Sequence, residues 1–327
     1  MHHLRAFLIF LVGLSTSLLA QEHPVHTYSI VARDPDTGEI GVAVQSHWFS
    51  VGSLVPWAEA GVGAVATQSF VDPAYGPLGL ELMRAGKTAR QALDGLLASD
   101  PGREVRQVAM VDAKGTIAAF TGSNCIPAAG HIEGEQFSVQ ANLMLNDKVW
   151  PAMAKAYREM RGDLADHLLA ALDAAQAAGG DIRGKQSAAI LIVRRNSTGK
   201  PWLDRIVDLR VEDHPEPLKE LRRLVAMRRA YRHMDDGDLA MEKKDVDRAL
   251  KSYSAAMQLN PENLEMKYWS AVSMANAGRL DDALPLLKSV FAADPNWREL
   301  TPRLRKVDLL KVSEKDLARI LAPTPSK

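Results

Sequence analysis

The sequence predicts an α+β domain built as a four-layer αββα sandwich, followed by an all-α segment. Up to about residue 211 the candidate elements come in the order strands, two helices, strands, two helices, strands, which favours α+β over regular βαβ units. Beyond that point no strand candidate occurs and an internal repeat appears. Two antiparallel sheets packed face to face, with a helix pair outside each, would bury the apolar faces of the first part.

The expected strands are stretches of apolar and β-branched residues between turn signals. "TYSIVARD" and "EIGVAVQS" enclose the turn signal "PDTG" and predict a hairpin, and "VRQVAMVD" and "TIAAFTG" predict a second one. Single strands are expected at 61–70, 136–145, 187–194 and 204–211. The glycines in the first of these would let another backbone or a ligand approach closely.

The helical spacing of apolar residues predicts four helices in two pairs, at 76–86, 88–99, 147–160 and 163–180. Thr88 is expected to be an N-cap, because its hydroxyl can accept a hydrogen bond from a free N–H of the first turn. Gly179 and Gly180 are expected to end the last helix, since glycine readily adopts the left-handed backbone of a helix end.

The second part of the chain contains a 34-residue repeat, which relates Ala249 to Ala283, Leu250 to Leu284 and Pro261 to Pro295. This spacing is the tetratricopeptide period. The first copy resembles the tetratricopeptide pattern at its small, aromatic and helix-ending positions, which are Gly237, Ala249, Tyr253, Ala256 and Pro261. The second copy keeps the small residues and the proline, but leucine replaces the aromatic residue, at Gly278, Ala283, Pro295 and Leu287.

We therefore expect tetratricopeptide-like repeats over 234–322, with a capping helix within 297–322. Two repeats are fewer than the usual minimum of about three. For that reason we expect them to pack on the first domain through a helix at 215–233. The resemblance implies a surface that binds a protein partner.

The charge composition argues against a nucleic-acid partner. The 327 residues include 40 Lys and Arg and 40 Asp and Glu, whereas nucleic-acid-binding proteins usually carry a clustered basic excess. The nine histidines show no metal-ligand spacing, and no glycine-rich phosphate loop occurs, so neither a metal nor a cofactor is expected. The composition leaves a homo-oligomer open.

Residues 1–20 are expected to form a signal peptide. Arg5 precedes an apolar stretch at 6–14, and small or polar residues lead to a cleavage site after Ala20. The apolar stretch is shorter than the ~20 residues of a membrane-spanning helix, and no other segment qualifies. The mature protein is therefore expected to be exported, to the periplasm or the extracellular space. Its single cysteine, Cys125, cannot form an internal disulfide.

Three residues are candidates for catalysis. Thr27 heads the first strand, and Cys125 with His131 would provide a nucleophile and a base. Each also has a structural interpretation, as a β-branched first strand residue, a buried thiol and a structural histidine. Polar residues near strand ends are the candidate binding residues: Arg33, Ser46, Asn142, Asp181, Arg183, Gln186 and Ser187.

Two of these binding candidates also have simpler interpretations. Arg33 precedes "DPDTG", which is an ordinary entry to a turn. Asp181 and Arg183 would form a surface ion pair after a helix end, a type of pair that contributes ~0–1 kcal/mol.

Five stretches together resemble the domain-of-unknown-function 1028 family: "TYSIVARDPDTGEIGVAVQS", "VPWAEAGVGAVATQSFVDPAYGPLGLELM", "FTGSNCIPAAGH", "GGDIRGKQSAAILIV" and "VDLRVEDHPEP". The resemblance covers nearly all of residues 26–225. It implies the αββα fold of the N-terminal nucleophile hydrolases, in which a Thr, Ser or Cys heads the first strand and attacks an amide. The α-amine of that residue acts as the base, and an α-amine with a pKa near ~8 suits neutral pH. By this resemblance Thr27 stands at the nucleophile position.

The residues before Thr27 decide whether it has a free amine. Cleavage after Ala20 leaves "QEHPVH" attached, and an amide nitrogen is not a base. Three functions therefore stay open. The first is an exported amidohydrolase of a small amide or peptide, which needs a second cut between His26 and Thr27. The second is a binding or scaffold protein whose repeats carry the function. The third is a hydrolase that uses Cys125 or Ser46.

Overall fold

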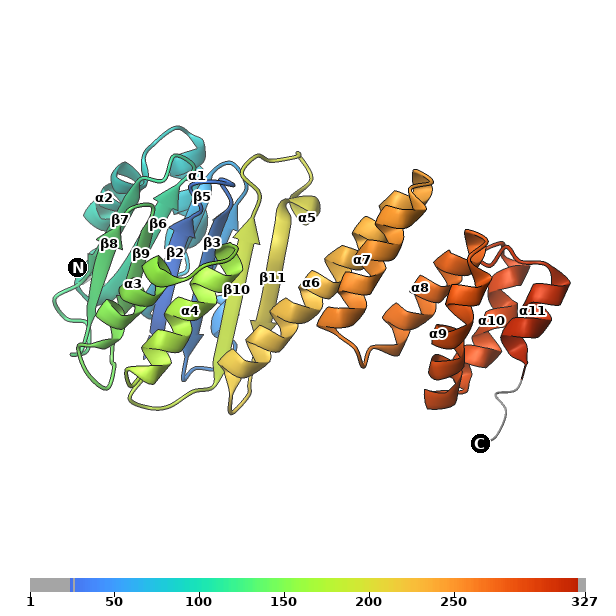
Figure 1. Cartoon of the computed structure of the whole chain (residues 1–327). Coiled ribbons are helices and arrows are strands. Elements are labelled where there is room, and N and C mark those ends of the chain that lie inside the picture. The colour runs from blue at the N-terminus through green and yellow to red at the C-terminus, as the bar shows by residue number, and fades with distance from the viewer. Residues whose placement is uncertain (1–23, 26, 323–327) are drawn as a thin grey trace, which may run out of the picture.

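The computed structural model describes residues 24–25 and 27–322, so the expected signal peptide lies outside the described residues. The described chain forms an N-terminal domain of two antiparallel sheets and their helices, then a C-terminal segment of helices alone (Figure 1). The expected four-layer αββα sandwich with a following helical segment is confirmed.

Sheet A, the smaller sheet, has five strands in the order β1-β5-β6-β7, and β4 also pairs with β5, at residues that β1 does not reach. Its strands are β1 (Pro24–Val25), β4 (Pro56–Glu59), β5 (Gly63–Phe70), β6 (Arg106–Asp112) and β7 (Ile117–Thr121). Sheet B has six strands in the order β11-β10-β3-β2-β9-β8. These are β2 (Thr27–Arg33), β3 (Ile40–Ser46), β8 (Gly130–Gly134), β9 (Phe137–Ala141), β10 (Ser187–Val193) and β11 (Arg205–Val211).

One helix pair covers the outer face of each sheet (Figure 1). The pair on sheet A is α1 (Tyr75–Arg84) and α2 (Ala89–Ser99), and the pair on sheet B is α3 (Val149–Glu159) and α4 (Leu164–Ala177). The expected N-cap is confirmed, because the Thr88 hydroxyl accepts a hydrogen bond from the Gln91 N–H within a capping box. The short elements η1 (Val51–Ser53), η2 (Arg103–Val105) and α5 (Pro201–Asp204) lie in loops.

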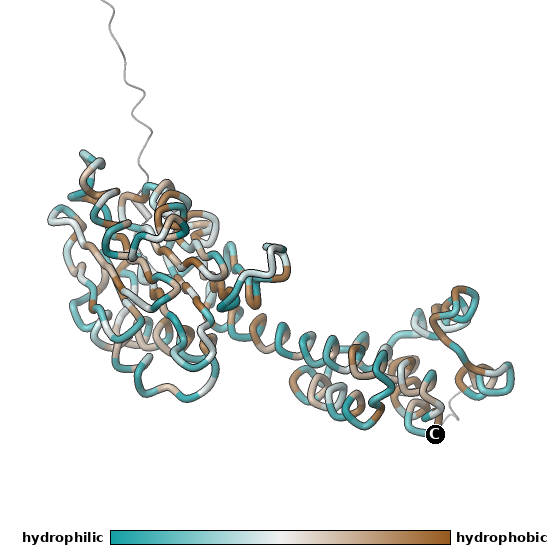
Figure 2. Tube along the Cα trace, turned by 90° about the horizontal axis from the view of Figure 1, so that it is seen from above, coloured by the Kyte–Doolittle hydropathy of each residue, from teal (hydrophilic) through white to brown (hydrophobic). Residues whose placement is uncertain are grey.

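Three apolar layers hold the N-terminal domain together. The middle layer, between the sheets, is built from small and β-branched residues such as Val31, Val44, Ala64, Ala109 and Val111. Larger residues fill the outer layers between each sheet and its helices. The strands are therefore buried on both faces over much of their length. Figure 2 shows brown, hydrophobic stretches within this domain.

Three strands, β1, β4 and β8, were not expected from the sequence, and β1 has only two residues. β4 reads "PWAE", which begins with a proline and shows no alternation, and β8 reads "GHIEG", which has a glycine at each end. Both lie at edges of their sheets, where pairing on one side needs less intrinsic strand preference.

The C-terminal segment consists of helices α6 (Pro217–Glu242), α7 (Val246–Leu259), α8 (Leu264–Asn276), α9 (Leu280–Ala293), α10 (Asn296–Lys306) and α11 (Glu314–Leu321). The repeat pattern is visible in the packing of α6 against α7. A Cβ on Gly237 would lie 2.3 Å from the ring of Tyr253, so only glycine lets the two helices approach this closely. The Tyr253 hydroxyl donates to Asp238 at 2.7 Å.

The structure differs from the expected organisation of this segment in two ways. α6 passes without a break through the expected boundary between 225 and 234, because its buried residues continue at helical spacing from Leu218 to Ala240. The expected capping helix within 297–322 is two helices, α10 and α11, since Asp308 takes a positive φ of 58° and ends the first. No helix in the described part of the chain is long and apolar enough to cross a membrane.

Candidate functional site

Thr27 is the first residue of β2 and faces sheet A. On this face of β2 it is followed by Ser29 and then Val31, which belongs to the middle apolar layer. In the strand register Thr27 lies opposite Ser46 of β3, and Ser46 lies opposite Ser187 of β10. Directly paired residues share a face, so three hydroxyl side chains stand in a row across sheet B. All three are fully buried.

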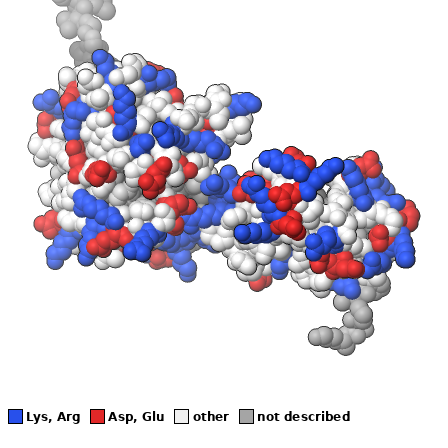
Figure 3. Space-filling view, turned by 45° about the horizontal axis from the view of Figure 1, so that its top comes forward, with Lys and Arg blue, Asp and Glu red and all other residues white. Residues whose placement is uncertain are grey.

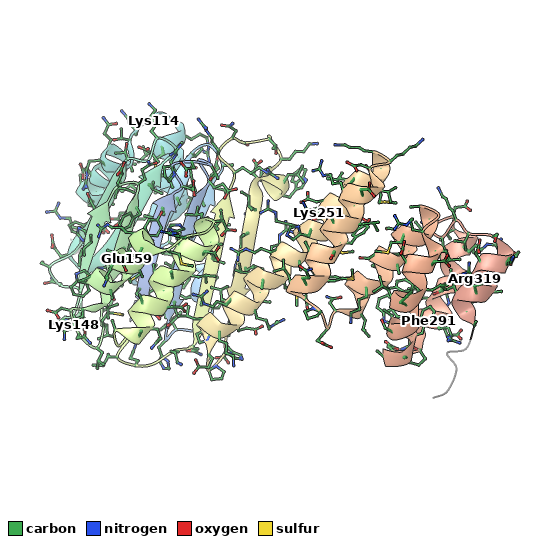
Figure 4. The ribbon with its side chains drawn as sticks, in the orientation of Figure 1. Lys114, Lys148, Glu159, Lys251, Phe291 and Arg319 are labelled. Carbon is green, nitrogen blue, oxygen red and sulfur yellow. The ribbon has the colours of Figure 1, made fainter. Side chains whose placement is uncertain are left out.

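The end of the sandwich that holds Thr27 can be followed in Figure 4. Lys148, the N-cap of α3, marks this end, and Lys114, in the turn between β6 and β7, marks the opposite end. The middle layer is apolar at the end marked by Lys114 and becomes polar at the end that holds Thr27.

A network of buried amides joins the two sheets beside Thr27. Gln68 of β5 accepts from the Ser29 hydroxyl at 2.6 Å and donates to Gln107 of β6 at 2.6 Å. Gln140 of β9 donates to the Ser29 hydroxyl at 2.6 Å. These side chains are fully buried, and burying so many amides is favourable only where their hydrogen bonds are satisfied. The network therefore fixes the spacing of the sheets at this end.

The main chain of Thr27 is held from both sheets. Its carbonyl oxygen accepts from the Gln68 amide at 3.1 Å and from the Asn142 backbone N–H at 3.1 Å. The side-chain amide of Asn142 lies 3.5 Å from the same oxygen and donates to Gln107 at 2.9 Å. Asn142 thus connects Thr27 to the buried network.

His131 joins the network at its edge. The Thr121 hydroxyl accepts from the Gln107 amide at 2.9 Å and lies 2.8 Å from His131 Nδ1. The Thr121 hydroxyl can either donate to His131 Nδ1 or accept from it, depending on the tautomer of the ring. Burial lowers the pKa of His131, with Glu133 opposing and Arg90 adding to the effect.

The loop before β10 places an ion pair beside the hydroxyl row. Asp181, whose side chain is fully buried, binds the Arg183 guanidinium at 2.7 Å and accepts from the His47 N–H at 3.2 Å. Ser187 accepts from the Val51 N–H at 3.1 Å and donates to the Trp48 carbonyl. Gln186 donates from its side chain to Asp213 at 3.2 Å. The bonds of Asp181 and Ser187 hold the loop after β3 against the start of β10, and the Gln186 bond ties this region to the residues after β11.

Strained backbone gathers at the same end. Seven described non-glycine residues have a positive φ, and four of them lie in loops or strand ends around Thr27: Ser50, Ser69, Ala128 and Leu143. Such conformations cost about 1–3 kcal/mol each and are concentrated at functional sites in proteins. This is a second, independent indication that this end of the sandwich carries the function.

Not all the predicted residues come together. Arg33 ends β2, six residues from Thr27, which is about 20 Å along an extended strand. It donates to the carbonyl of Ala113 at 3.0 Å and to Gln136, so it ties the opposite end of the sandwich. A cavity of about 350 Å³ lies there between Arg33, Phe137, Tyr157 and His167.

Cys125 and His131 make separate contacts. The Cys125 thiol is buried and donates to the carbonyl of Arg106 at 3.3 Å, whereas His131 bonds to Thr121. Burial raises the pKa of the Cys125 thiol. The fraction of reactive thiolate at neutral pH is correspondingly small.

The network contains members that the sequence reading missed, namely Gln107, Thr121, Ser138 and Gln140. The signal for them was present. In "FSVQAN" the polar residues Ser138, Gln140 and Asn142 alternate with apolar ones along a strand that turns out to be buried on both faces. A polar alternation in a central strand indicates a polar layer rather than a solvent-exposed face. Among residues 24–25 and 27–322 no group of three or more His, Cys, Asp or Glu could hold a metal ion.

Comparisons with known proteins agree with this architecture. The model of the family of unknown function DUF1028 matches residues 27–221, and a tetratricopeptide repeat model matches residues 240–302. A crystal structure of protein SPO2555 from Silicibacter pomeroyi, of the same DUF1028 family, is 32% identical, with a TM-score of 0.56. The match covers 61% of this chain and 88% of that chain. The comparison with curated proteins finds no match. Since the family model spans more than half of its residues, the chain belongs to the DUF1028 family and carries tetratricopeptide repeats behind that domain.

Proposed function

We propose that the N-terminal domain is an exported amide-bond hydrolase whose nucleophile is Thr27, and that the repeats bind a protein partner. The observation that carries the proposal is the position of Thr27. It heads a central strand on the face between the sheets, and its carbonyl is fixed by donors from both sheets. A nucleophile needs this kind of fixed backbone beside a polar environment.

The reaction follows from the groups at hand. Once the bond between His26 and Thr27 is cut, the Thr27 α-amine takes the proton of its own hydroxyl while the oxygen attacks the substrate carbonyl. The amine then gives that proton to the leaving nitrogen, and an ester to Thr27 forms. Water hydrolyses the ester and restores the hydroxyl. The Asn142 amide is our candidate donor to the negative oxygen that forms during attack, and this role requires one of its N–H groups to turn away from the Thr27 carbonyl.

A cut before Thr27 is required by the same chemistry. With His26 attached, the Thr27 nitrogen is an amide and cannot accept the proton. Removal of the preceding residues would give Thr27 its base, and because Thr27 is fully buried in the form described, substrate access requires a change from this form as well. The form described is, in this proposal, the precursor.

The test compares two versions of the protein. One begins at Thr27, released from a cleavable fusion, and the other begins at Gln21. Both are assayed against a panel of peptidyl and aminoacyl amides that release a chromophore. We expect hydrolysis only by the chain that begins at Thr27, with loss in Thr27→Ala and partial retention in Thr27→Ser. Hydrolysis by the Gln21 chain, confirmed intact by mass spectrometry, would contradict the proposal.

The residues Cys125 and Ser46 provide matched controls. We expect Cys125→Ala to keep its activity, because the thiol is buried and its pKa is raised. If instead Cys125→Ala or Ser46→Ala abolishes hydrolysis while Thr27→Ala keeps it, the nucleophile is not Thr27.

A binding or scaffold protein is the second candidate, and the burial of Thr27, Ser46 and Ser187 favours it. In that case the buried network is structural and the repeats carry the function. Absence of hydrolysis by the chain that begins at Thr27, together with unchanged partner binding in full-length Thr27→Ala, would support this candidate. The charged residues of both signs are mixed over the face shown in Figure 3, so a protein partner would meet a surface of mixed charge.

A further inference from the structure

The edge of β5 beside Thr27 carries a short strand. β1 pairs antiparallel with β5, with Pro24 opposite Phe70 and Val25 opposite Ser69. On the other side of β5, β6 pairs with this stretch, and Ser69 lies opposite Arg106. β4 pairs with an earlier stretch of β5, residues 63–66. β1 therefore occupies a stretch of edge that no other described strand pairs with.

β1 leads directly to Thr27. The chain leaves sheet A at Val25 and enters sheet B at Thr27, so one residue separates the strand on β5 from the proposed nucleophile. The peptide bond that must be cut in the precursor lies in that step. Its acyl side is therefore the segment that is paired with β5.

The β5 edge is held in a fixed shape at this point. Ser69 is fully buried and has a φ of 72°, a conformation that serine rarely adopts. The carbonyl of Phe70 accepts from the Arg106 guanidinium at 2.7 Å, and the same guanidinium binds Asp100 at 2.9 Å. Both charged side chains are nearly buried, with 6% and 12% exposed. A buried ion pair thus fixes the backbone opposite β1.

We infer that the β5 edge at Ser69–Phe70 is the substrate-binding strand of this site, and that the substrate is an extended peptide. Its residues on the acyl side of the scissile bond add to β5 antiparallel, in the place of β1, and this sets the scissile carbonyl at Thr27. Strand addition of this kind draws its affinity from main-chain hydrogen bonds. The inference rests on the proposed function for the cleavage step but not for the binding step.

The binding step is tested without catalysis. The Thr27→Ala chain that begins at residue 27 is titrated calorimetrically with the hexapeptide QEHPVH, which has the sequence of residues 21–26. The family match begins at residue 27, so this chain keeps the complete domain, and its thermal transition checks that it folds. We expect saturable binding and at least tenfold weaker binding of a scrambled hexapeptide.

Backbone methylation identifies the strand pairing. Successive residues of an antiparallel strand alternate between facing the partner with their N–H and facing away. The hexapeptide is therefore methylated at the nitrogen of its Val or of its last His, one at a time. We expect one methylated peptide to lose at least tenfold in affinity and the other to bind nearly unchanged. Equal binding of the two, or no binding by the unmodified hexapeptide, would overturn the inference.

The cleavage step is tested with substrates that share one leaving group and differ in acyl length from one to four residues. The chain that begins at Thr27 is expected to show at least tenfold higher kcat/KM for three residues than for one. Equal rates along the series would overturn the inference and leave the proposed function standing. No hydrolysis of any member, with the hexapeptide still bound, would overturn the proposed function and leave the strand site standing.

Discussion

The carbonyl oxygen of Thr27 in sheet B accepts a 3.1 Å hydrogen bond from the side-chain amide of Gln68 in sheet A. This bond crosses the middle layer of the sandwich at the point where that layer changes from apolar to polar. It joins the proposed nucleophile to a network that also fixes Ser29 and Gln107. The position of Thr27 therefore depends on the spacing of the two sheets.

Replacing Gln68 by methionine keeps the volume and removes the bonds. Thr27, Ser29 and Gln107 would each lose a buried partner, and we expect the free energy of unfolding to fall by about 2–4 kcal/mol. Urea unfolding followed by circular dichroism measures the change. Gln258→Met, at an exposed position of α7, is the control and should lie within about 0.5 kcal/mol of wild type. A Gln68→Met protein as stable as this control would show that the network is energetically neutral.

His131 predicts how stability depends on pH. Burial lowers its pKa below the usual value of about 6.5, so the unfolded chain binds a proton more readily than the folded one. The contribution of neutral His131 is therefore complete above pH ~6.5 and is lost as the pH falls below it, by at most about 1.4 kcal/mol per pH unit.

The measurement is the free energy of unfolding of wild type and His131→Gln between pH 7.5 and 5.5. We expect the wild-type curve to fall more steeply with acidification than that of the variant. His233→Gln, on α6, is the control. Parallel curves for wild type and His131→Gln would show that His131 titrates alike in both states.

A side chain at position 237 is expected to disturb the packing of the repeats. An added Cβ would lie 2.3 Å from the Tyr253 ring, so Gly237→Ala must push α6 and α7 apart. Overpacking costs about 1–3 kcal/mol, and the better helix preference of alanine returns at most about 1 kcal/mol. We expect a net loss, visible as an earlier urea transition.

Gly95 provides the matched control, because it is an exposed helical glycine with no atom within 4 Å of an added Cβ. Gly95→Ala should be neutral or stabilising by up to about 1 kcal/mol. If Gly237→Ala behaves like Gly95→Ala, the close approach of α6 and α7 does not limit the stability of the repeats.

Substitutions of Asp181 and Arg183 are expected to have non-additive effects on the free energy of unfolding. Arg183→Gln leaves a buried carboxylate without its charged partner, whereas the double variant Asp181→Asn, Arg183→Gln removes the charge as well. We expect the single Arg183→Gln change to cost about 1–3 kcal/mol more than the double change, because an unpaired buried charge is costlier than an absent pair. A double-mutant cycle by urea unfolding measures the coupling. A coupling near zero would place the pair among surface ion pairs.

The parts of the fold that could be predicted from sequence rest on local patterns. The hairpin of β2 and β3 follows from the apolar and β-branched residues on both sides of "PDTG", and in the structure it pairs Thr27 with Ser46. The Thr88 cap and the Gly237–Tyr253 contact follow from residue types at fixed spacing. β1, β4 and β8 could not be predicted, because two to five residues with proline or glycine carry no periodic signal.

The candidate site depends on contacts between distant parts of the chain. Ser187 joins Thr27 and Ser46 only because β10 pairs with β3, and the sequence indicates no strand order. The side chains of Gln68 and Gln107 bond to each other in sheet A and reach Gln140 in sheet B through Ser29, which no single stretch reveals. Arg33 is a binding candidate because it is a polar residue at a strand end, but it lies at the opposite end of β2 from Thr27.

Helix α6 sets a length requirement on any substrate that the repeats deliver. It begins at the Thr27 end of the sandwich, where Lys185 pairs with Glu216, and it continues unbroken into the first repeat. Its 26 residues correspond to a rod of about 39 Å. A polypeptide held at the far end of this rod needs a tether of at least about 12 extended residues to span the same distance back. Substrates shorter than that would have to reach Thr27 without help from the repeats.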